Sequence, residues 1–337
     1  MESRLTTLAL IIGLASSCGG GGGVGTDADT DGTGDPADDV AVDVSPDVQE
    51  DAAPDPEGDP GEDGPAGCPL PGDLGSGNHD VTLEHDSMTR EYIAHVPPGY
   101  DPSTPTALVL NMHGYTSNAE QQVAFSNMNA TADAEGFIAL YPNGYENSWN
   151  GGTCCGQAAA EGIDDVGFLV SVVTDVSTKL CIDPDRVYAA GMSNGGYMSH
   201  RLACEASDVF AAVAPVAAGI GITGCSPPRP VPVIMFHGTD DSYVPFSSAE
   251  TALSAWGSHN SCTSTPVTTS FGDSYCDVHE TCDGGSEVGL CALVGMDHCW
   301  PGGAPPRMLC ETFVGTYSED INANDYMWEF FSRHPMP

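Results

Sequence analysis

The sequence predicts one α/β domain over residues 68–337, with a mostly parallel central sheet and helices on both faces. Two observations support this architecture. Short apolar segments alternate with segments of helical periodicity from residue 106 onward, a pattern typical of parallel sheets. The first 67 residues differ sharply in composition, so they lie outside the domain. The remaining 270 residues or so are enough for a single large core.

The strands and helices are predicted from apolar runs and from their spacing. From Asp164, apolar side chains recur at helical spacing behind acidic residues of the first turn, which favours a helix. Residues 251–293 are rich in Ser, Thr, Gly and Cys, and we expect a loop-rich, disulfide-stapled insertion there. The predicted strands are 106–112, 137–141, 186–190, 210–216 and 231–236, and the predicted helices are 164–180 and 194–204.

The N-terminal residues 1–18 have the pattern of a signal peptide. Arg4 precedes an apolar run that is too short to span a membrane permanently. Small residues lie directly before Cys18, as in the bacterial lipobox, whose cysteine receives lipid. We therefore expect lipidation of Cys18 and an extracellular or cell-surface location, with an outer-membrane lipoprotein favoured. Plain secretion is the alternative.

Residues 19–67 are predicted to be a disordered acidic linker. They hold 15 Asp or Glu, many Gly and Pro, and no aromatic residue, so they cannot bury enough apolar surface to fold. An Asp-rich stretch beginning at Asp27 resembles the start of a calcium loop but lacks the flanking helices and the final Glu. We predict no metal and no cofactor.

The charge balance excludes nucleic acid as a partner. The formal net charge is −40, with eight Lys or Arg residues in the whole chain. A chain with so few basic residues has no surface that could neutralise phosphates. The acidic surface would also repel polyanionic substrates.

The chain contains thirteen cysteines, of which Cys18 is assigned to lipidation. Twelve remain, an even number in a chain addressed to an oxidising compartment, and this predicts disulfides. A zinc site would require paired or clustered ligands that are absent here. Cys299 and Cys310 bracket a Pro/Gly-rich loop and are a candidate pair, while the neighbours Cys154 and Cys155 are expected in separate disulfides.

The nucleophile is predicted from Gly191-Met192-Ser193-Asn194-Gly195, a G-x-S-x-G sequence between a predicted strand and a predicted helix. Glycines are needed because this turn is too tight for Cβ atoms, and the strain lifts the serine hydroxyl above the sheet. Ser193 is therefore the candidate nucleophile.

A serine nucleophile needs a base and an acid that orients the base, and in this architecture they follow in the order Ser, acid, His. The loop after residue 236 offers two neighbouring acids, Asp240 and Asp241, while His237 is interpreted as structural. The next suitable base is His298. Asp297 is a poor orienter because adjacent side chains rarely point at one another.

His259 and His279 are poor alternatives for the base, since no strand precedes either of them. The oxyanion of acyl transfer also needs two backbone donors. We expect the amides of Asn194 and Tyr115, with Gly114 allowing close approach. His113 serves to hold that loop.

These segments together resemble feruloyl esterases and their relatives. The group includes the feruloyl and acetylxylan esterases of carbohydrate esterase family one and the similar poly(3-hydroxybutyrate) depolymerases. The resemblance spans residues 82–334 and implies an α/β-hydrolase fold. It is carried by residues 113–115, 141–144, 148–150, 154–156, 164–166, 186–188, 191–196, 237–239, 295–298 and 300–302.

The resemblance implies that Ser193 is the nucleophile, His298 the base, and the Tyr115 and Asn194 amides the oxyanion donors. The acid is the fifth residue of the His-Gly-x-x-Asp stretch, which is Asp241 here. Asp240 occupies a variable position.

Trp149 lies where the family builds the wall of its cleft, and Trp300 follows the base by two residues. Either ring could stack on a sugar or feruloyl ring, or belong to the core. We assign both to substrate binding as an expectation.

The predicted function is therefore hydrolysis of a feruloyl or acetyl ester on plant polysaccharide, through an acyl-enzyme, by a monomer whose contact with membrane is a lipid anchor at Cys18. Depolymerisation of poly(3-hydroxybutyrate) or a related polyester is the alternative. A non-catalytic surface adhesin on a hydrolase scaffold conflicts with the intact Ser, Asp and His. A peptidase would usually bring an additional domain.

Overall fold

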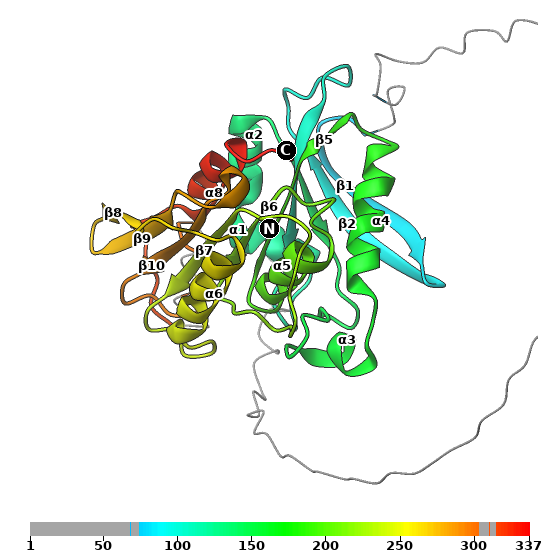
Figure 1. Cartoon of the computed structure of the whole chain (residues 1–337). Coiled ribbons are helices and arrows are strands. Elements are labelled where there is room, and N and C mark those ends of the chain that lie inside the picture. The colour runs from blue at the N-terminus through cyan, green and yellow to red at the C-terminus, as the bar shows by residue number, and fades with distance from the viewer. Residues whose placement is uncertain (1–67, 69–73, 303–309, 311–314) are drawn as a thin grey trace, which may run out of the picture. The chain divides into compact units, whose positions relative to one another are not determined.

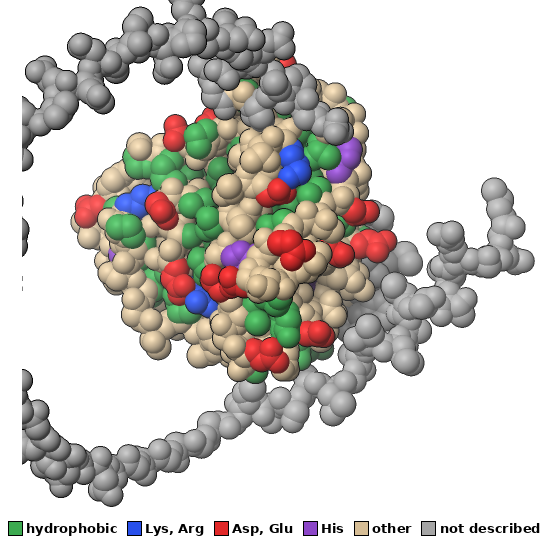
Figure 2. Space-filling view, turned by 90° about the vertical axis from the view of Figure 1, so that its right-hand side faces the viewer, with side chains coloured by type: hydrophobic (Ala, Val, Ile, Leu, Met, Phe, Trp, Pro, Cys, Tyr) green, Lys and Arg blue, Asp and Glu red, His purple; other side chains and the backbone are tan. Residues whose placement is uncertain are grey.

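The structure is a computed structural model that describes Cys68, residues 74–302, Cys310 and residues 315–337 (Figure 1). The predicted signal peptide, Cys18 and the linker 19–67 lie outside these residues. No helix in the described part is long and apolar enough to cross a membrane. Acidic side chains are spread over the face shown in Figure 2, with few basic ones among them.

The domain is built on one sheet in the order β1-β2-β4-β3-β5-β6-β7-β10-β9-β8. The middle strands, from β4 to β10, run parallel, and an antiparallel hairpin extends the sheet at each edge. The strands are β1 (Gly77–His85), β2 (Met88–Val96), β3 (Thr106–Met112), β4 (Ile138–Pro142), β5 (Ile182–Met192), β6 (Ala212–Val216), β7 (Val233–Gly238), β8 (Val267–Phe271), β9 (Ser274–His279) and β10 (Val288–Leu293).

Helices cover both faces of the sheet and bury an apolar core on each. The core on one face includes Phe168 of α4, Leu202 of α5 and Trp256 of α6. The other includes Met128 of α2 and Phe331 of α8, and α2 and α8 lie side by side in Figure 1. The helices are α1 (Ala119–Ser126), α2 (Met128–Glu135), α3 (Gly156–Glu161), α4 (Asp165–Ser177), α5 (Asn194–Glu205), α6 (Phe246–His259) and α8 (Ala323–Ser332).

The predicted elements agree with the structure through the parallel part of the sheet. Each predicted strand corresponds to one of β3, β4, β5, β6 and β7, and the two predicted helices are α4 and α5. As expected, α4 begins at an acidic cap, where Asp164 Oδ1 accepts a hydrogen bond from the Gly167 amide at 2.9 Å. Such a cap satisfies one of the free amides of the first turn. The prediction of a mostly parallel sheet with helices on both faces is confirmed.

The segment 251–293 is stapled by disulfides as expected, but it is not mainly loop. It holds most of α6, the β8–β9 hairpin and β10, and β10 is a buried strand beside β7. The β8 side chains are mostly exposed, so Ser and Thr replace the apolar pattern that marks an interior strand. The polar composition therefore concealed regular structure.

All twelve cysteines expected in disulfides are bonded. Cys299 pairs with Cys310 as suggested, whereas the expectation for Cys154 and Cys155 is wrong, because they bond to each other. Within the described residues no other cysteine is left for either sulfur, since the other ten described cysteines pair among themselves. Besides Cys299–Cys310, those pairs are Cys68–Cys181, Cys204–Cys225, Cys262–Cys282 and Cys276–Cys291.

Candidate active site

Ser193 lies in the turn between β5 and α5, at the carboxyl edge of the sheet. Its backbone adopts φ 53° and ψ −119°, a strained conformation for a residue with a Cβ. The flanking glycines are required by space, because a Cβ at Gly195 would lie 2.3 Å from the Met112 carbonyl oxygen. The Ser193 amide donates to Val216 O at the end of β6 (2.8 Å). The turn therefore has the geometry of a nucleophile elbow.

Asp241 and His298 form a direct pair on loops that follow β7 and β10. His298 Nδ1 lies 2.8 Å from Asp241 Oδ2, and the Asp241 side chain is fully buried. Because Nδ1 donates to the carboxylate, Nε2 carries the lone pair. The neighbouring Asp240 is exposed, so the structure places Asp241 rather than Asp240 against His298. Neither Ser193 Oγ nor His298 Nε2 is engaged by another side chain in the described residues.

The environment of Asp241 keeps it ionised. Burial alone would raise the pKa of Asp241, but His298 and the Val244 amide hold it below the usual value. His237 Nε2 lies 3.4 Å from Asp241 Oδ2 and donates to Val244 O at 2.8 Å. Burial lowers the pKa of His237, which fits the predicted structural role at the strand end.

Asp297 joins the two loops that carry the acid and the base. Its Oδ1 accepts hydrogen bonds from the Ser242 amide (2.8 Å), the Ser242 hydroxyl (2.9 Å) and the His298 amide (2.8 Å). Gly238 permits this approach, since a Cβ there would lie 2.2 Å from Met296 O. These hydrogen bonds, which hold the two loops together, were not predicted from the sequence.

The predicted oxyanion donors lie beside Ser193. A Cβ built on Gly114 would be 3.5 Å from Ser193 Cβ, so the loop after β3 packs against the nucleophile. Asn194 follows Ser193 at the first position of α5, where the amide has no partner within the helix. Neither the Tyr115 nor the Asn194 amide donates to another described residue, which leaves both free for an oxyanion.

His113 holds the oxyanion loop as a neutral side chain. Its Nδ1 donates to Gly114 O at 2.8 Å, and its Nε2 accepts from the Gly144 amide at 2.9 Å. The ring is fully buried, and burial lowers the pKa of His113 to about 4. A protonated ring would lose the acceptor that Gly144 needs.

We expect the free energy of unfolding to fall between pH 6.5 and pH 4. In this window His113 takes up a proton in the unfolded chain but not in the folded one, because its pKa falls from 6.5 to about 4 on folding. A shift of this size contributes up to about 3 kcal/mol above pH 6.5, which is lost as the pH falls. Denaturant unfolding from pH 4 to 7.5 measures the slope. His113→Gln should flatten it, whereas the half-exposed His259→Gln should not; equal slopes in all three proteins would refute the assignment.

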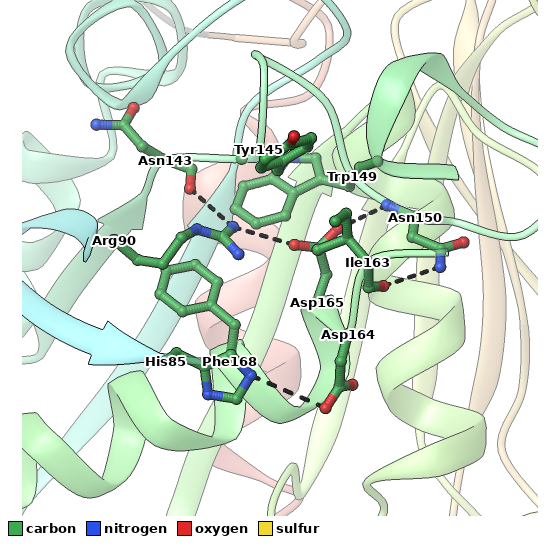
Figure 3. Close-up of polar contacts among 12 residues, drawn as sticks. His85, Arg90, Asn143, Tyr145, Trp149, Asn150, Ile163, Asp164, Asp165 and Phe168 are labelled. Carbon is green, nitrogen blue, oxygen red and sulfur yellow. Dashed lines mark hydrogen bonds and ion pairs between the residues drawn. The ribbon is translucent and has the colours of Figure 1, made fainter. Parts of the chain in front are cut away.

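A buried ion pair between Arg90 and Asp165 holds the segment 143–150, which follows β4, as Figure 3 shows. Arg90 Nη2 lies 3.0 Å from Asp165 Oδ1 and also donates to Asn143 O, while its guanidinium lies 3.7 Å from the centre of the Phe168 ring. The second Asp165 oxygen accepts from the Asn150 amide at 2.8 Å. Arg90 was not singled out from the sequence, although it is an unusual basic residue in an acidic chain.

Trp149 and Trp300 are core residues, so the prediction that both bind substrate is wrong. Their side chains are 0% and 1% exposed, so neither presents a ring face to a ligand. Trp149 Nε1 donates to His113 O at 3.0 Å, and its backbone amide donates to Asn194 Oδ1 at 2.7 Å. Trp300 Nε1 donates to Asn324 Oδ1 at 3.0 Å. Trp149 therefore holds the backbone of His113, in the loop after β3 that carries Tyr115.

The Cys299–Cys310 disulfide lies next to the base, and we expect its reduction to impair activity first. It fixes the residue after His298, and a disulfide stabilises by roughly 2–4 kcal/mol. Ester hydrolysis should be lost at a lower reductant concentration than helix content, measured by circular dichroism. The variant Cys299→Ser/Cys310→Ser should lose ester hydrolysis while its helix content stays intact. The variant Cys204→Ser/Cys225→Ser should retain more of the wild-type hydrolysis rate than that variant. Parallel loss of activity and helix content in every case would contradict this.

The chain matches the family described as Esterase PHB depolymerase over residues 90–227. Feruloyl esterase B of Piromyces equi is 33% identical over 233 residues, which cover 62% of this chain and 42% of that protein. Feruloyl esterase C of Emericella nidulans is 32% identical over 184 residues, which cover 53% of this chain and 64% of that protein. The predicted resemblance to the feruloyl esterase branch is confirmed. This chain spans less than two thirds of the length of either esterase.

The resemblance and the geometry are complementary. The family match contains Ser193 but ends before Asp241 and His298, and the structure independently brings these two together. The acetyl xylan esterase from Aspergillus awamori aligns with a TM-score of 0.56 at 16% identity, covering 69% of this chain and 98% of that one. At this identity the likeness concerns the fold alone. The predicted α/β-hydrolase fold is confirmed.

Proposed function

We propose that this chain is a serine carboxylic-ester hydrolase in which Ser193, His298 and Asp241 are the catalytic triad. The observation that carries the proposal is the buried Asp241–His298 pair, whose loops follow parallel strands at the same sheet edge as the strained serine turn. An ordinary turn serine would need neither the strain nor the paired acid and base. The similarity to feruloyl esterases supports the same reaction class.

The residues can carry out acyl transfer in two balanced steps. Ser193 Oγ attacks the ester carbonyl carbon while His298 Nε2 accepts the hydroxyl proton, and the Tyr115 and Asn194 amides stabilise the oxyanion. The C–O bond to the alcohol then breaks, and the alcohol leaves with the proton from His298. Water then attacks the acyl carbon as His298 Nε2 takes its proton; the C–O bond to Ser193 Oγ breaks, His298 returns the proton to that oxygen, and the carboxylic acid leaves.

The proposed substrates are feruloyl or acetyl esters of plant polysaccharide. Two relatives are feruloyl esterases by name, and another is a bifunctional acetylxylan esterase/xylanase of Neocallimastix patriciarum. The family description favours a polyester depolymerase as the alternative. Six disulfides fit an extracellular protein. We propose export of a monomer, with a lipid anchor at Cys18 as its one contact with a membrane.

A substrate panel tests this proposal. The wild-type protein is assayed on methyl ferulate, p-nitrophenyl acetate, p-nitrophenyl butyrate and a suspension of poly(3-hydroxybutyrate). We expect the highest kcat/KM on the ferulate or the acetate ester. Release of soluble acids from the suspension, with weak activity on the small esters, would instead support the polyester alternative. Hydrolysis of none of the four would contradict the proposed function.

A further inference from the structure

Two exposed tyrosines belong to the loops of the active site. Among the described residues, large apolar side chains are exposed at four positions: Tyr115 (49%), Tyr243 (53%), Val267 and Val294. Exposing an aromatic ring costs the free energy that its burial would gain. Core packing therefore does not explain why two such rings are exposed beside one site.

Tyr243 lies against the base. The centres of its ring and the His298 ring are 5.2 Å apart, with 39° between their planes. Its amide donates to Asp241 Oδ1 at 2.9 Å, so the backbone that carries the ring is fixed to the catalytic acid. The phenol hydroxyl has no partner among the described residues. The ring is held against His298 while about half of the residue stays exposed.

Tyr115 lies on the oxyanion side of the nucleophile. One edge of its ring packs over Gly156, where a Cβ would lie 2.5 Å from Tyr115 Cε2 and 2.6 Å from Ser148 Cβ. Gly156 therefore leaves the space that the ring occupies, directly after the Cys154–Cys155 disulfide. Half of the side chain remains exposed. Packing at Gly156 restrains this ring too, although it remains half-exposed.

We propose that Tyr115 and Tyr243 determine specificity by binding a flat ring of the substrate, either an aromatic ring of the acyl group or a sugar ring of the alcohol. This inference rests on the proposed function. An ester carbonyl that Ser193 attacks lies between His298 and the Tyr115 amide. The acyl and alcohol groups on the two sides of this carbonyl therefore extend past Tyr115 and past Tyr243, which lies against His298. Tyrosine rings stack on other aromatic rings and on the apolar faces of sugars, and they have few torsions to immobilise.

The test compares kcat/KM for three esters: methyl ferulate, an acetylated xylo-oligosaccharide and ethyl butyrate. The first has a ring in its acyl group, the second in its alcohol, and the third has none. Tyr115→Ala and Tyr243→Ala should lower the ratio of ring-bearing to ring-free kcat/KM by about tenfold, which corresponds to the stacking free energy of an aromatic pair. Tyr243→Phe should preserve most of the ratio because it keeps the ring.

Val267→Ala is the matched control, since Val267 is equally exposed (48%) but lies on the edge strand β8. It should leave all three rates unchanged. A fall confined to methyl ferulate assigns the ring to the acyl group, and a fall confined to the acetylated sugar assigns it to the alcohol. An active wild-type enzyme whose ratios are unchanged in both alanine variants would overturn the inference and leave the proposed function intact. A wild-type protein that hydrolyses none of the three and does not hydrolyse the poly(3-hydroxybutyrate) suspension would overturn the proposed function itself.

Discussion

Replacing Ser193 by alanine will lower kcat for ester hydrolysis by on the order of 10⁴-fold or more. The substitution removes the atom that attacks the carbonyl, so water must attack directly. In serine hydrolases the residual acceleration, about 10³–10⁴ over water, comes from the oxyanion hole and substrate binding alone. Initial rates on p-nitrophenyl acetate with purified protein measure the loss.

A second serine substitution serves as the control for this loss. Ser254 is exposed on α6, and Ser254→Ala should retain wild-type kcat. Both variants should unfold at the same denaturant concentration as the parent within error, because neither substitution removes core volume. Wild-type turnover in Ser193→Ala would end the assignment of the nucleophile.

Replacing Asp241 by asparagine will cost about 10³- to 10⁴-fold in kcat. The carboxylate accepts from His298 Nδ1, and this fixes the lone pair on Nε2, which must receive the serine proton. An amide can instead donate to Nδ1, so the ring takes the tautomer that cannot act as a base. The charge that stabilises the imidazolium is lost as well.

Asp240→Asn is a closely matched control because it makes the same change one residue earlier, on an exposed side chain. We expect its kcat to stay within about twofold of wild type, as surface substitutions away from a site have small effects. Large loss in Asp240→Asn with little in Asp241→Asn would reverse the roles of the two acids.

The sequence was most informative where function depends on local backbone geometry. A G-x-S-x-G turn between an apolar strand and a helix specifies its own conformation, so Ser193 could be placed without any long-range contact. The loops after β3 and β7 could be predicted to converge with the serine turn because parallel strands end at one edge of a sheet. The strand before His298, β10, lies in the segment that was interpreted as loop. Asp241 and His298 are 57 residues apart in sequence. Their pairing could still be predicted, because the nucleophile, the acid and the histidine follow in this order along the chain in this fold.

Long-range packing could not be read in the same way. The Arg90–Asp165 pair joins residues 75 apart, and no local pattern shows which acid a buried arginine meets. Trp149 lies where the family builds its cleft wall and Trp300 follows His298 by two residues, but both indole N–H groups donate to acceptors inside the domain. The edge hairpin of β1 and β2 was also not predicted, because Val81 is the one buried residue of β1 and no apolar run marks the strand.

The buried face of α6 follows a local spacing in the sequence, although this helix was not predicted. Ala249, Ala252 and Trp256 are the buried residues of α6, and they follow the three- and four-residue spacing of one helix face. The surrounding Ser and Thr residues hid this spacing in a segment interpreted as loop. Composition was therefore a weaker guide there than periodicity.

Mass spectrometry after reaction with a fluorophosphonate tests the central claim, that Ser193 is a nucleophile activated by His298 and Asp241, most directly. The reagent forms a stable phosphonyl ester with an activated serine and releases fluoride, so one adduct should appear on the intact protein. Peptide mapping should place it on Ser193, and labelling should be absent in Ser193→Ala and strongly slowed in Asp241→Asn. Folded protein that stays unlabelled, or that carries its adduct on another serine, would contradict the account.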